Sequence, residues 1–87
     1  MTEEAHETRL RRLRMRSWRR GTKEMDLILG PYADAELGAL GPDALDAYEA
    51  LLSENDQDRY RWASGADPVP DRHAGAMERV TRAFAAR

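Results

Sequence analysis

The sequence predicts an all-α fold, a small five-helix bundle that forms a single domain over residues 1–87. Three observations support this prediction. Apolar residues recur at spacings of three and four, which is the period of a helix with one buried face. No run alternates apolar and polar residues with period two, and β-branched residues are few. Glycine and proline divide the chain into segments of helical length.

The first predicted helix follows residues 1–7, a polar and acidic stretch that we expect to be a disordered tail. Leu10, Leu13 and Ser17, with Trp18 near the end, lie along one side of this helix. The remaining sides carry arginine. We therefore expect the helix to contact the body through a narrow apolar stripe and to leave most of its surface exposed.

The second predicted helix has the strongest apolar pattern and should form the centre of the core. Its apolar residues repeat at spacings of three and four over sixteen positions, at Met25, Ile28, Leu29, Tyr32, Ala33, Leu37 and Leu40. Gly30-Pro31 interrupts the pattern, because proline lacks an amide donor and crowds the carbonyl four residues back. Since the apolar phase continues past the proline, we expect one kinked or briefly broken helix with a single buried face.

Turn and capping residues delimit the next two helices. Gly41-Pro42 predicts a turn with proline in the first turn of a third helix, over residues 43–53. The inward residues of that helix are Leu45, Tyr48, Leu51 and Leu52. Asn55 is suited to cap the start of a fourth helix. Tyr60 and Trp62 in this helix cannot both face inward, so we expect one of them to cover the edge of the core.

The last helix is separated from the fourth by Gly65 and a rigid turn. Gly65 suits a helix end, because a left-handed backbone conformation costs glycine little. Two prolines make residues 67–71 a turn, and the fifth helix is predicted from there to Ala86. Its apolar stripe consists of Ala74, Met77, Val80, Thr81 and Phe84.

Composition limits the sites and locations that this chain supports. The absence of cysteine excludes disulfides, thiolate metal sites and thiol nucleophiles. No stretch approaches the roughly 20 apolar residues that cross a bilayer, and the N-terminus lacks the apolar core of a signal peptide. These features predict a cytoplasmic protein without membrane insertion.

Catalytic and metal-binding patterns are missing from the sequence. His6 and His73 stand alone, each without a second ligand at metal spacing, and both are interpreted as solvated. No glycine-rich phosphate loop follows a strand, and there is no serine elbow. The many carboxylates are interpreted as a solvated face. The sequence therefore predicts a protein that is not an enzyme and binds no cofactor or metal of its own.

The charge of the chain changes sign at one place, the segment of residues 19–26, which we name the charge-reversal corner. Residues 9–23 include eight basic residues and no acidic one, whereas residues 24–58 include ten acidic residues and no basic one. Gly21 suits the end of the first helix, and Thr22 suits the cap of the second. The corner is therefore both a helix junction and a boundary between opposite charges.

Two interpretations of the charge-reversal corner remain open from the residues alone. Arg20 at a helix end and Glu24 at a helix start both complement the helix dipoles, which favours a structural role. Alternatively, Gly21 allows close approach of a partner, Arg20 offers a planar five-donor fork, and Glu24 supplies an acceptor one turn away. A partner protein could recognise such a corner.

Three interpretations compete for the arginine-rich first helix. A nucleic-acid surface would use the guanidinium groups on phosphates, but the acidic half of the chain would be repelled. A membrane-surface helix needs a broader apolar face than this stripe provides. Pairing of the arginines with the acidic helices explains the pattern with the fewest assumptions, and the residues alone favour it.

Arg20-Gly21-x-x-Glu24, with an arginine-rich helix before it and Met25-Asp26-Leu27-Ile28-Leu29 after it, resembles the RGxxE motif of the SdhE/YgfY family, which is succinate dehydrogenase assembly factor 2-like. The resemblance extends over about residues 10–84, with the Leu-Leu-Ser-Glu-Asn-Asp junction at residues 51–56 and the aromatics at Tyr60 and Trp62. RGxxE alone is a weak pattern. Together with chain length, the motif's position and the helical layout, it is fairly specific.

The resemblance implies a YgfY-like helical assembly factor, or chaperone. Such a factor binds the flavoprotein subunit of succinate dehydrogenase, or in some bacteria of fumarate reductase, and promotes covalent attachment of FAD to it. FAD then belongs to the client. The implied partner-binding residues are Arg20, Gly21 and Glu24, with their neighbours Arg19, Trp18 and Asp26. The alternative is a generic helical protein- or nucleic-acid-binding module that uses the arginines of residues 9–20.

Overall fold

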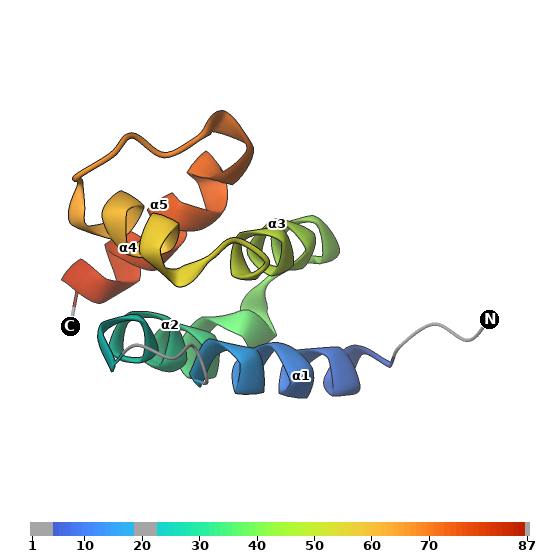
Figure 1. The fold of residues 1–87 in the computed structure, drawn as a ribbon. Coiled ribbons are helices and arrows are strands. Elements are labelled where there is room, and N and C mark those ends of the chain that lie inside the picture. The colour runs from blue at the N-terminus through green and yellow to red at the C-terminus, as the bar shows by residue number, and fades with distance from the viewer. Residues whose placement is uncertain (1–4, 19–22, 87) are drawn as a thin grey trace.

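The computed structural model describes residues 5–18 and 23–86 (Figure 1). The helices are α1 (His6–Trp18), α2 (Lys23–Glu36), α3 (Pro42–Leu52), α4 (Asp56–Ser64) and α5 (Ala74–Ala85), with the short 3-10 helices η1 (Leu37–Ala39) and η2 (Asp71–His73). The described residues include five α-helices and no strand, so the predicted all-α five-helix fold is confirmed.

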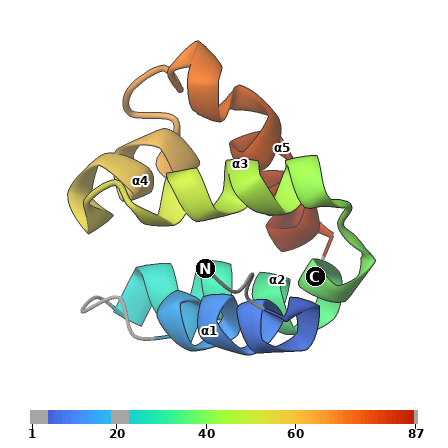
Figure 2. The same ribbon diagram turned by 90° about the vertical axis from the view of Figure 1, so that its right-hand side faces the viewer.

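The helices are arranged in two layers. Figures 1 and 2 show α1 and α2 side by side in one layer, with α3, α4 and α5 in a second layer across them. α2 packs against α1 in its own layer and against α4 and α5 in the other. The core therefore lies between the layers, and α2 is its central element.

The buried residues of α2 and η1 follow the predicted pattern. Met25, Leu29, Ala33 and Leu37 are fully buried, and Leu40 is half-buried at the edge of the core. α2 continues through Pro31 as one α-helix, so the predicted single buried face is confirmed and the brief break at Gly30-Pro31 is absent. A proline in a helix is tolerated when tertiary burial of the apolar face outweighs its local cost.

The predicted caps of α3 and α4 are also present. Gly41 is the N-cap of α3 and Pro42 occupies its first turn. The side chain of Asn55 accepts a hydrogen bond from the Asp58 amide at 2.8 Å. Gly65 ends α4 with a φ of 83°, in the left-handed region that favours glycine.

The aromatic pair in α4 divides between core and surface, as expected. Trp62 packs against the core, whereas the Tyr60 side chain is 45% exposed. The two positions are about 200° apart around a helix, so burying one of them exposes the other.

The described part of the N-terminal stretch differs from the prediction of a disordered tail over residues 1–7. α1 already begins at His6, and the Arg9 amide donates to the Ala5 carbonyl at 2.9 Å. Glu7 lies in the first turn, where a negative charge interacts favourably with the helix dipole. Residues 1–4 lie outside the described residues. His6 is exposed, as predicted.

Three residues of the predicted α5 stripe are not in the core. Ala74 is exposed, Thr81 is half-buried and Phe84 is 49% exposed, whereas Ala76, Met77 and Val80 are buried. The predicted helix also divides into η2 and α5. Ala74 is the first residue of α5 and Phe84 lies in its last turn, so the core covers only the middle of the predicted stripe.

The interpretation of His73 as a solvated side chain is wrong. His73 is buried, its Nε2 lies 2.9 Å from a Glu54 carboxylate oxygen, and its ring centroid lies 5.5 Å from that of Trp62. His73 precedes Met77 by four residues and Val80 by seven, so it shares their inward face. That spacing was visible in the sequence and indicated burial.

Arg59 is a second buried polar residue that the sequence analysis did not identify. Its side chain is fully buried. Nη1 donates to the Leu52 carbonyl at 2.9 Å and lies 3.5 Å from the Leu51 carbonyl, while Nη2 pairs with Asp56. Arg59 thus satisfies carbonyls at the C-terminus of α3. Its position three residues before Trp62, on the same face of α4, was the available signal.

Candidate functional site

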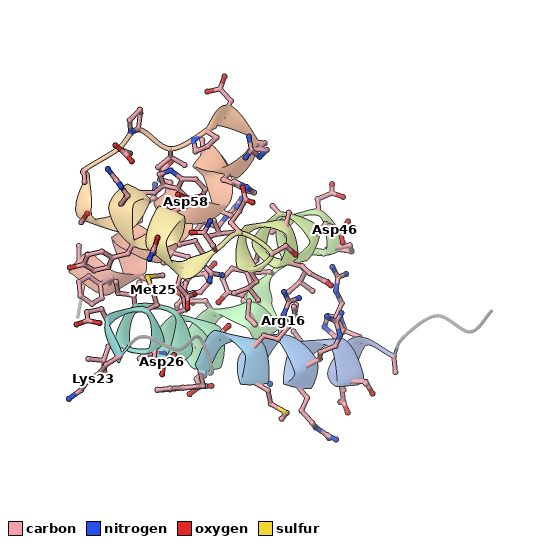
Figure 3. The ribbon with its side chains drawn as sticks, in the orientation of Figure 1. Arg16, Lys23, Met25, Asp26, Asp46 and Asp58 are labelled. Carbon is pink, nitrogen blue, oxygen red and sulfur yellow. The ribbon has the colours of Figure 1, made fainter. Side chains whose placement is uncertain are left out.

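The arginines of α1 lie on two sides of the helix. Arg9, Arg12 and Arg16 face α3, and Figure 3 shows Arg16 rising from α1 toward that helix. Arg9 pairs with Asp46 at 2.6 Å. Glu49 lies 3.1 Å from Arg9, 3.0 Å from Arg12 and 3.9 Å from Arg16. Internal pairing with an acidic helix is therefore confirmed for these three arginines.

The loss of folding stability at acid pH should arise in part from protonation of the Glu49 carboxylate. Hydrogen bonding by Arg12, with a further contribution from Arg9, lowers the pKa of Glu49 although partial burial acts in the opposite direction. A carboxylate with a lowered folded-state pKa stabilises the fold above its unfolded-state pKa. That stabilisation is lost as the pH falls through the folded-state pKa. Glu49→Gln should therefore be less stable than wild type at pH 7, with a difference that shrinks as the solution is acidified.

Urea unfolding at pH 7 and at decreasing acid pH values measures this difference. Glu36→Gln is the matched control, because Glu36 is an exposed glutamate of α2 outside the α1 to α3 ion pairs. A Glu49→Gln deficit that stays constant from neutral to acid pH would contradict a role for the carboxylate charge.

The opposite side of α1 carries Arg11, Arg14, Met15 and Trp18. The helical period places these residues away from Arg9, Arg12 and Arg16. They line an open hollow of about 580 Å³ together with Glu7 and Leu10. Met15 is 49% exposed and Trp18 is 41% exposed. The outer side of α1 is therefore both basic and apolar.

Trp18, a predicted site residue, is held on the surface of α2. A Cβ at Gly30 would lie 2.5 Å from two carbons of the indole ring, so the ring rests directly on the glycine backbone. The indole Nε1 donates to an Asp34 carboxylate oxygen at 3.2 Å. Gly30 is therefore a positioning residue for Trp18 that the sequence analysis treated only as a helix interruption. Its signal was a glycine within a strong helical pattern.

The other described residues of the predicted site lie in the first turn of α2. Glu24 is exposed and Asp26 is half-buried, both at the positive end of the helix dipole. Figure 3 shows Lys23 pointing away from the body at this corner and Met25 pointing into the interior. Asp26 precedes Gly30 by one turn, so it lies on the side of α2 that Trp18 covers. Glu24 lies on a different side.

Arg19, Arg20, Gly21 and the predicted cap Thr22 lie outside the described residues. The part of the predicted site that can be placed therefore consists of Trp18, Glu24 and Asp26, which flank this segment from the end of α1 and the start of α2. These described residues form two neighbouring surfaces of α2 rather than one enclosed pocket.

Glu24 borders an apolar cleft between α2, α4 and α5, which we name the α2/α4/α5 cleft. Its volume is about 600 Å³, and its lining consists of Glu24, Leu27, Ile28, Tyr60, Ala63, Ser64, Thr81, Phe84 and Ala85. This cleft was not predicted from the sequence, because the apolar spacing of α5 placed Phe84 in the core. The cleft gives Glu24 apolar neighbours from the opposite layer.

The described residues of the predicted site are available for contact with a partner, because Trp18 is 41% exposed and Glu24 is exposed. Within residues 5–18 and 23–86, no three histidine, aspartate or glutamate side chains are grouped so that they could hold a metal ion. In the same ranges, none of the helices has the length and apolarity that crossing a bilayer requires. The site is best described as a candidate protein-docking surface.

Comparisons with known proteins give a consistent result. A family model described as Flavinator of succinate dehydrogenase matches residues 11–85. Three similar proteins are each named Succinate dehydrogenase assembly factor 2, mitochondrial. The protein of Meyerozyma guilliermondii is 42% identical over 74 residues, which cover 82% of this chain and 55% of that protein. The protein of Mycosarcoma maydis is 41% identical over 71 residues, which cover 82% of this chain and 30% of that protein.

The protein of Penicillium rubens is 43% identical over 61 residues, which cover 70% of this chain and 20% of that protein. This chain therefore spans between 20% and 55% of the length of the three relatives. The matched region includes most of the described helices, from within α1 to the end of α5.

The names of these relatives contradict the predicted cytoplasmic location. All three relatives are named as mitochondrial, and this finding overturns the prediction of a cytoplasmic location. The prediction rested on the absence of cysteine and of an apolar signal core. Mitochondrial transit peptides are amphipathic and arginine-rich, so a search for an apolar core cannot detect them.

Proposed function

Because the chain belongs to the flavinator of succinate dehydrogenase family, we propose that it is an assembly factor that promotes covalent attachment of FAD to the flavoprotein subunit of succinate dehydrogenase. The family match over residues 11–85 is the observation that carries this proposal. The flavoprotein subunit of fumarate reductase is a second proposed client, to which FAD would be attached covalently in the same way. In this proposal FAD is bound by the client, and the chain supplies neither a cofactor nor a catalytic group.

The proposed mechanism is selection of a client conformation. Covalent attachment needs a client side chain aligned with the reacting carbon of the flavin, together with stabilisation of the charge that develops on the ring. Those groups belong to the client and to FAD. A factor that binds the attachment-competent conformation more tightly than the open one raises its population. A tenfold preference corresponds to about 1.4 kcal/mol.

The charge-reversal corner, together with the adjacent Trp18, is the proposed docking surface. Trp18 presents a half-exposed indole that Gly30 and Asp34 hold in place, and Glu24 presents an exposed carboxylate on the adjacent side of α2. Arg20 and Gly21 are assigned to the surface by the RGxxE motif, in which arginine supplies donors and glycine allows close approach. Arg19 and Asp26 flank these residues in the sequence and complete the proposed surface.

The alternative of a nucleic-acid-binding module is not favoured by the arginine contacts. Arg9, Arg12 and Arg16 are directed to carboxylates of α3, so three of the five arginines of α1 face this acidic helix. Phosphate binding would have to displace these ion pairs.

Reconstitution with apo-flavoprotein, FAD and this chain tests the proposal. Covalent flavin is scored by fluorescence in a denaturing gel. Wild type should accelerate attachment. Glu24→Gln should slow it about tenfold, the effect of losing one charged contact of about 1.4 kcal/mol. Gly21→Arg should also slow it about tenfold, because a large side chain there would block close approach of the client. Glu36→Gln, a change of an exposed glutamate elsewhere in α2, should behave like wild type.

Two outcomes would contradict different parts of the proposal. If wild type does not change the rate of attachment, the proposed function is wrong. If wild type accelerates attachment and the folded Glu24→Gln and Gly21→Arg variants do so equally well, the docking surface lies elsewhere. Circular dichroism distinguishes loss of function from loss of the helical fold.

A further inference from the structure

We propose that the α2/α4/α5 cleft is a second contact surface for the flavoprotein client and takes an amphipathic segment with apolar side chains followed by a lysine or arginine. The inference rests on the proposed function, because it assigns the occupant to the same client. It adds a partner chemistry and a set of contact residues that the RGxxE motif does not include.

The apolar part of the cleft is built from three helices. Leu27 of α2, Tyr60 of α4 and Phe84 of α5 are 51%, 45% and 49% exposed and line the same cleft. Among the described residues, these are three of the five large apolar side chains that are exposed. Large apolar side chains gathered on one surface are typical of a protein-interaction site. The volume of about 600 Å³ accommodates a few side chains of a partner segment.

The polar part of the surface adjoins this apolar cleft. A second hollow of about 300 Å³ is lined by Glu24, Asp56, Gln57 and Tyr60. Glu24 and Tyr60 therefore belong to both hollows. Asp56 already pairs with Arg59, whereas Glu24 and Gln57 are exposed. The rim of the apolar cleft thus carries negative charge and an amide.

Charge complementarity selects the occupant. A segment with a basic residue next to its apolar side chains would place the positive charge beside Glu24 and Asp56. An acidic peptide, a nucleic acid or an anionic lipid surface would be repelled by the same carboxylates. An amphipathic helix laid into a groove presents apolar and polar residues at such spacings.

Continuity with the proposed docking surface assigns this segment to the flavoprotein. Glu24 belongs both to the RGxxE motif and to the lining of the cleft. A client bound at Glu24 is therefore already beside Leu27 and Tyr60. A second copy of this chain is the competing occupant, since the outer side of α1 is also apolar and basic, at Arg11, Arg14, Met15 and Trp18.

Affinity for the apo-flavoprotein, measured by titration calorimetry, tests the apolar part. Leu27→Ser and Phe84→Ser should each raise Kd about tenfold, which corresponds to about 1.4 kcal/mol. Met15→Ser is the control, because Met15 is also 49% exposed but lies on α1 outside the cleft. It should leave Kd within about twofold of wild type. Circular dichroism and urea unfolding establish that each variant is folded.

A charge series at Gln57 tests the polar part. Gln57→Lys should raise Kd several-fold and Gln57→Glu should lower it, and both effects should weaken as salt is added. Both substitutions place a long side chain at the same exposed position in the first turn of α4. Opposite changes in Kd therefore cannot result from a general loss of structure. An anionic occupant would reverse the two signs and overturn the proposal.

The remaining outcomes separate this inference from the proposed function. If wild type binds the flavoprotein and accelerates flavin attachment while Leu27→Ser and Phe84→Ser bind it within twofold of wild type, the cleft inference is wrong and the proposed function stands. If these variants instead abolish self-association in sedimentation and leave client binding unchanged, the occupant is a second copy. Failure of wild type to bind any flavoprotein subunit overturns both.

Discussion

Arg59→Ala should lower the free energy of unfolding by about 3 kcal/mol. Arg59 is fully buried and donates to the Leu52 carbonyl at 2.9 Å, with the Leu51 carbonyl 3.5 Å from the same nitrogen. Alanine removes these donors and leaves a cavity where a large side chain was packed. A chain of this length has a total stability on the order of 4–13 kcal/mol, so the expected loss is a large share of it.

Two further variants separate the causes of this loss. Arg59→Met fills much of the cavity but cannot donate hydrogen bonds, so it should be more stable than Arg59→Ala and less stable than wild type. Arg61→Ala removes another arginine of α4, whose pair with Asp67 is exposed at 60% and 45%. It should change stability by less than about 1 kcal/mol. Equal effects of Arg59→Ala and Arg61→Ala in urea unfolding would contradict the buried role of Arg59.

Gly30→Ala should lower the free energy of unfolding by about 1–2 kcal/mol, although alanine is normally the better residue inside a helix. A Cβ at this position would lie 2.5 Å from the Trp18 ring, so the indole must move away. The displaced ring loses its packing on α2 and its hydrogen bond to Asp34. This cost exceeds the gain in helix propensity, which is about 1 kcal/mol.

A double-mutant cycle tests whether the contact with Trp18 causes this loss of stability, because Gly30→Ala should change from destabilising to stabilising when Trp18 is absent. In a Trp18→Ala background the steric conflict is absent, and Gly30→Ala should then raise stability by about 0.5–1 kcal/mol. Trp18 fluorescence should also shift in Gly30→Ala, because the ring becomes more exposed to water. If alanine at position 30 destabilises equally with and without Trp18, the indole contact is not the cause.

Gly30→Ala also bears on the docking surface. Trp18 is a proposed contact of the client, and Gly30 positions it without lying in the RGxxE motif. Gly30→Ala should therefore weaken binding of the flavoprotein while leaving Glu24 unchanged. The effect on binding and the fluorescence shift should appear together in the same variant.

The sequence alone determined the helical elements, because each depends on local features. The apolar period of residues 25–40 identified the central helix, and Asn55 and Gly65 marked the ends of α4 through caps that involve neighbouring residues. The motif at Arg20, Gly21 and Glu24 carried the family resemblance, which the family match confirms. Such local signals can be recognised without knowledge of the tertiary structure.

Only the tertiary structure determined which charged side chains form ion pairs and which side chains are buried. The α1 arginines look alike in sequence, yet Arg9, Arg12 and Arg16 meet α3 more than 30 residues away while Arg11 and Arg14 lie on the other side. Burial of Arg59 likewise depends on carbonyls of another helix. Packing and pairing are contacts between distant segments, so spacing along one helix cannot specify them.

The charge-reversal corner shows both contributions. Its motif was visible in the sequence, because Arg20, Gly21 and Glu24 lie within five residues. Its surroundings were not, because Gly30 and Asp34 from α2 hold Trp18, and residues of α4 and α5 form the cleft beside Glu24. A local motif identifies candidate contact residues, whereas the helices packed around them determine the surface that a partner meets.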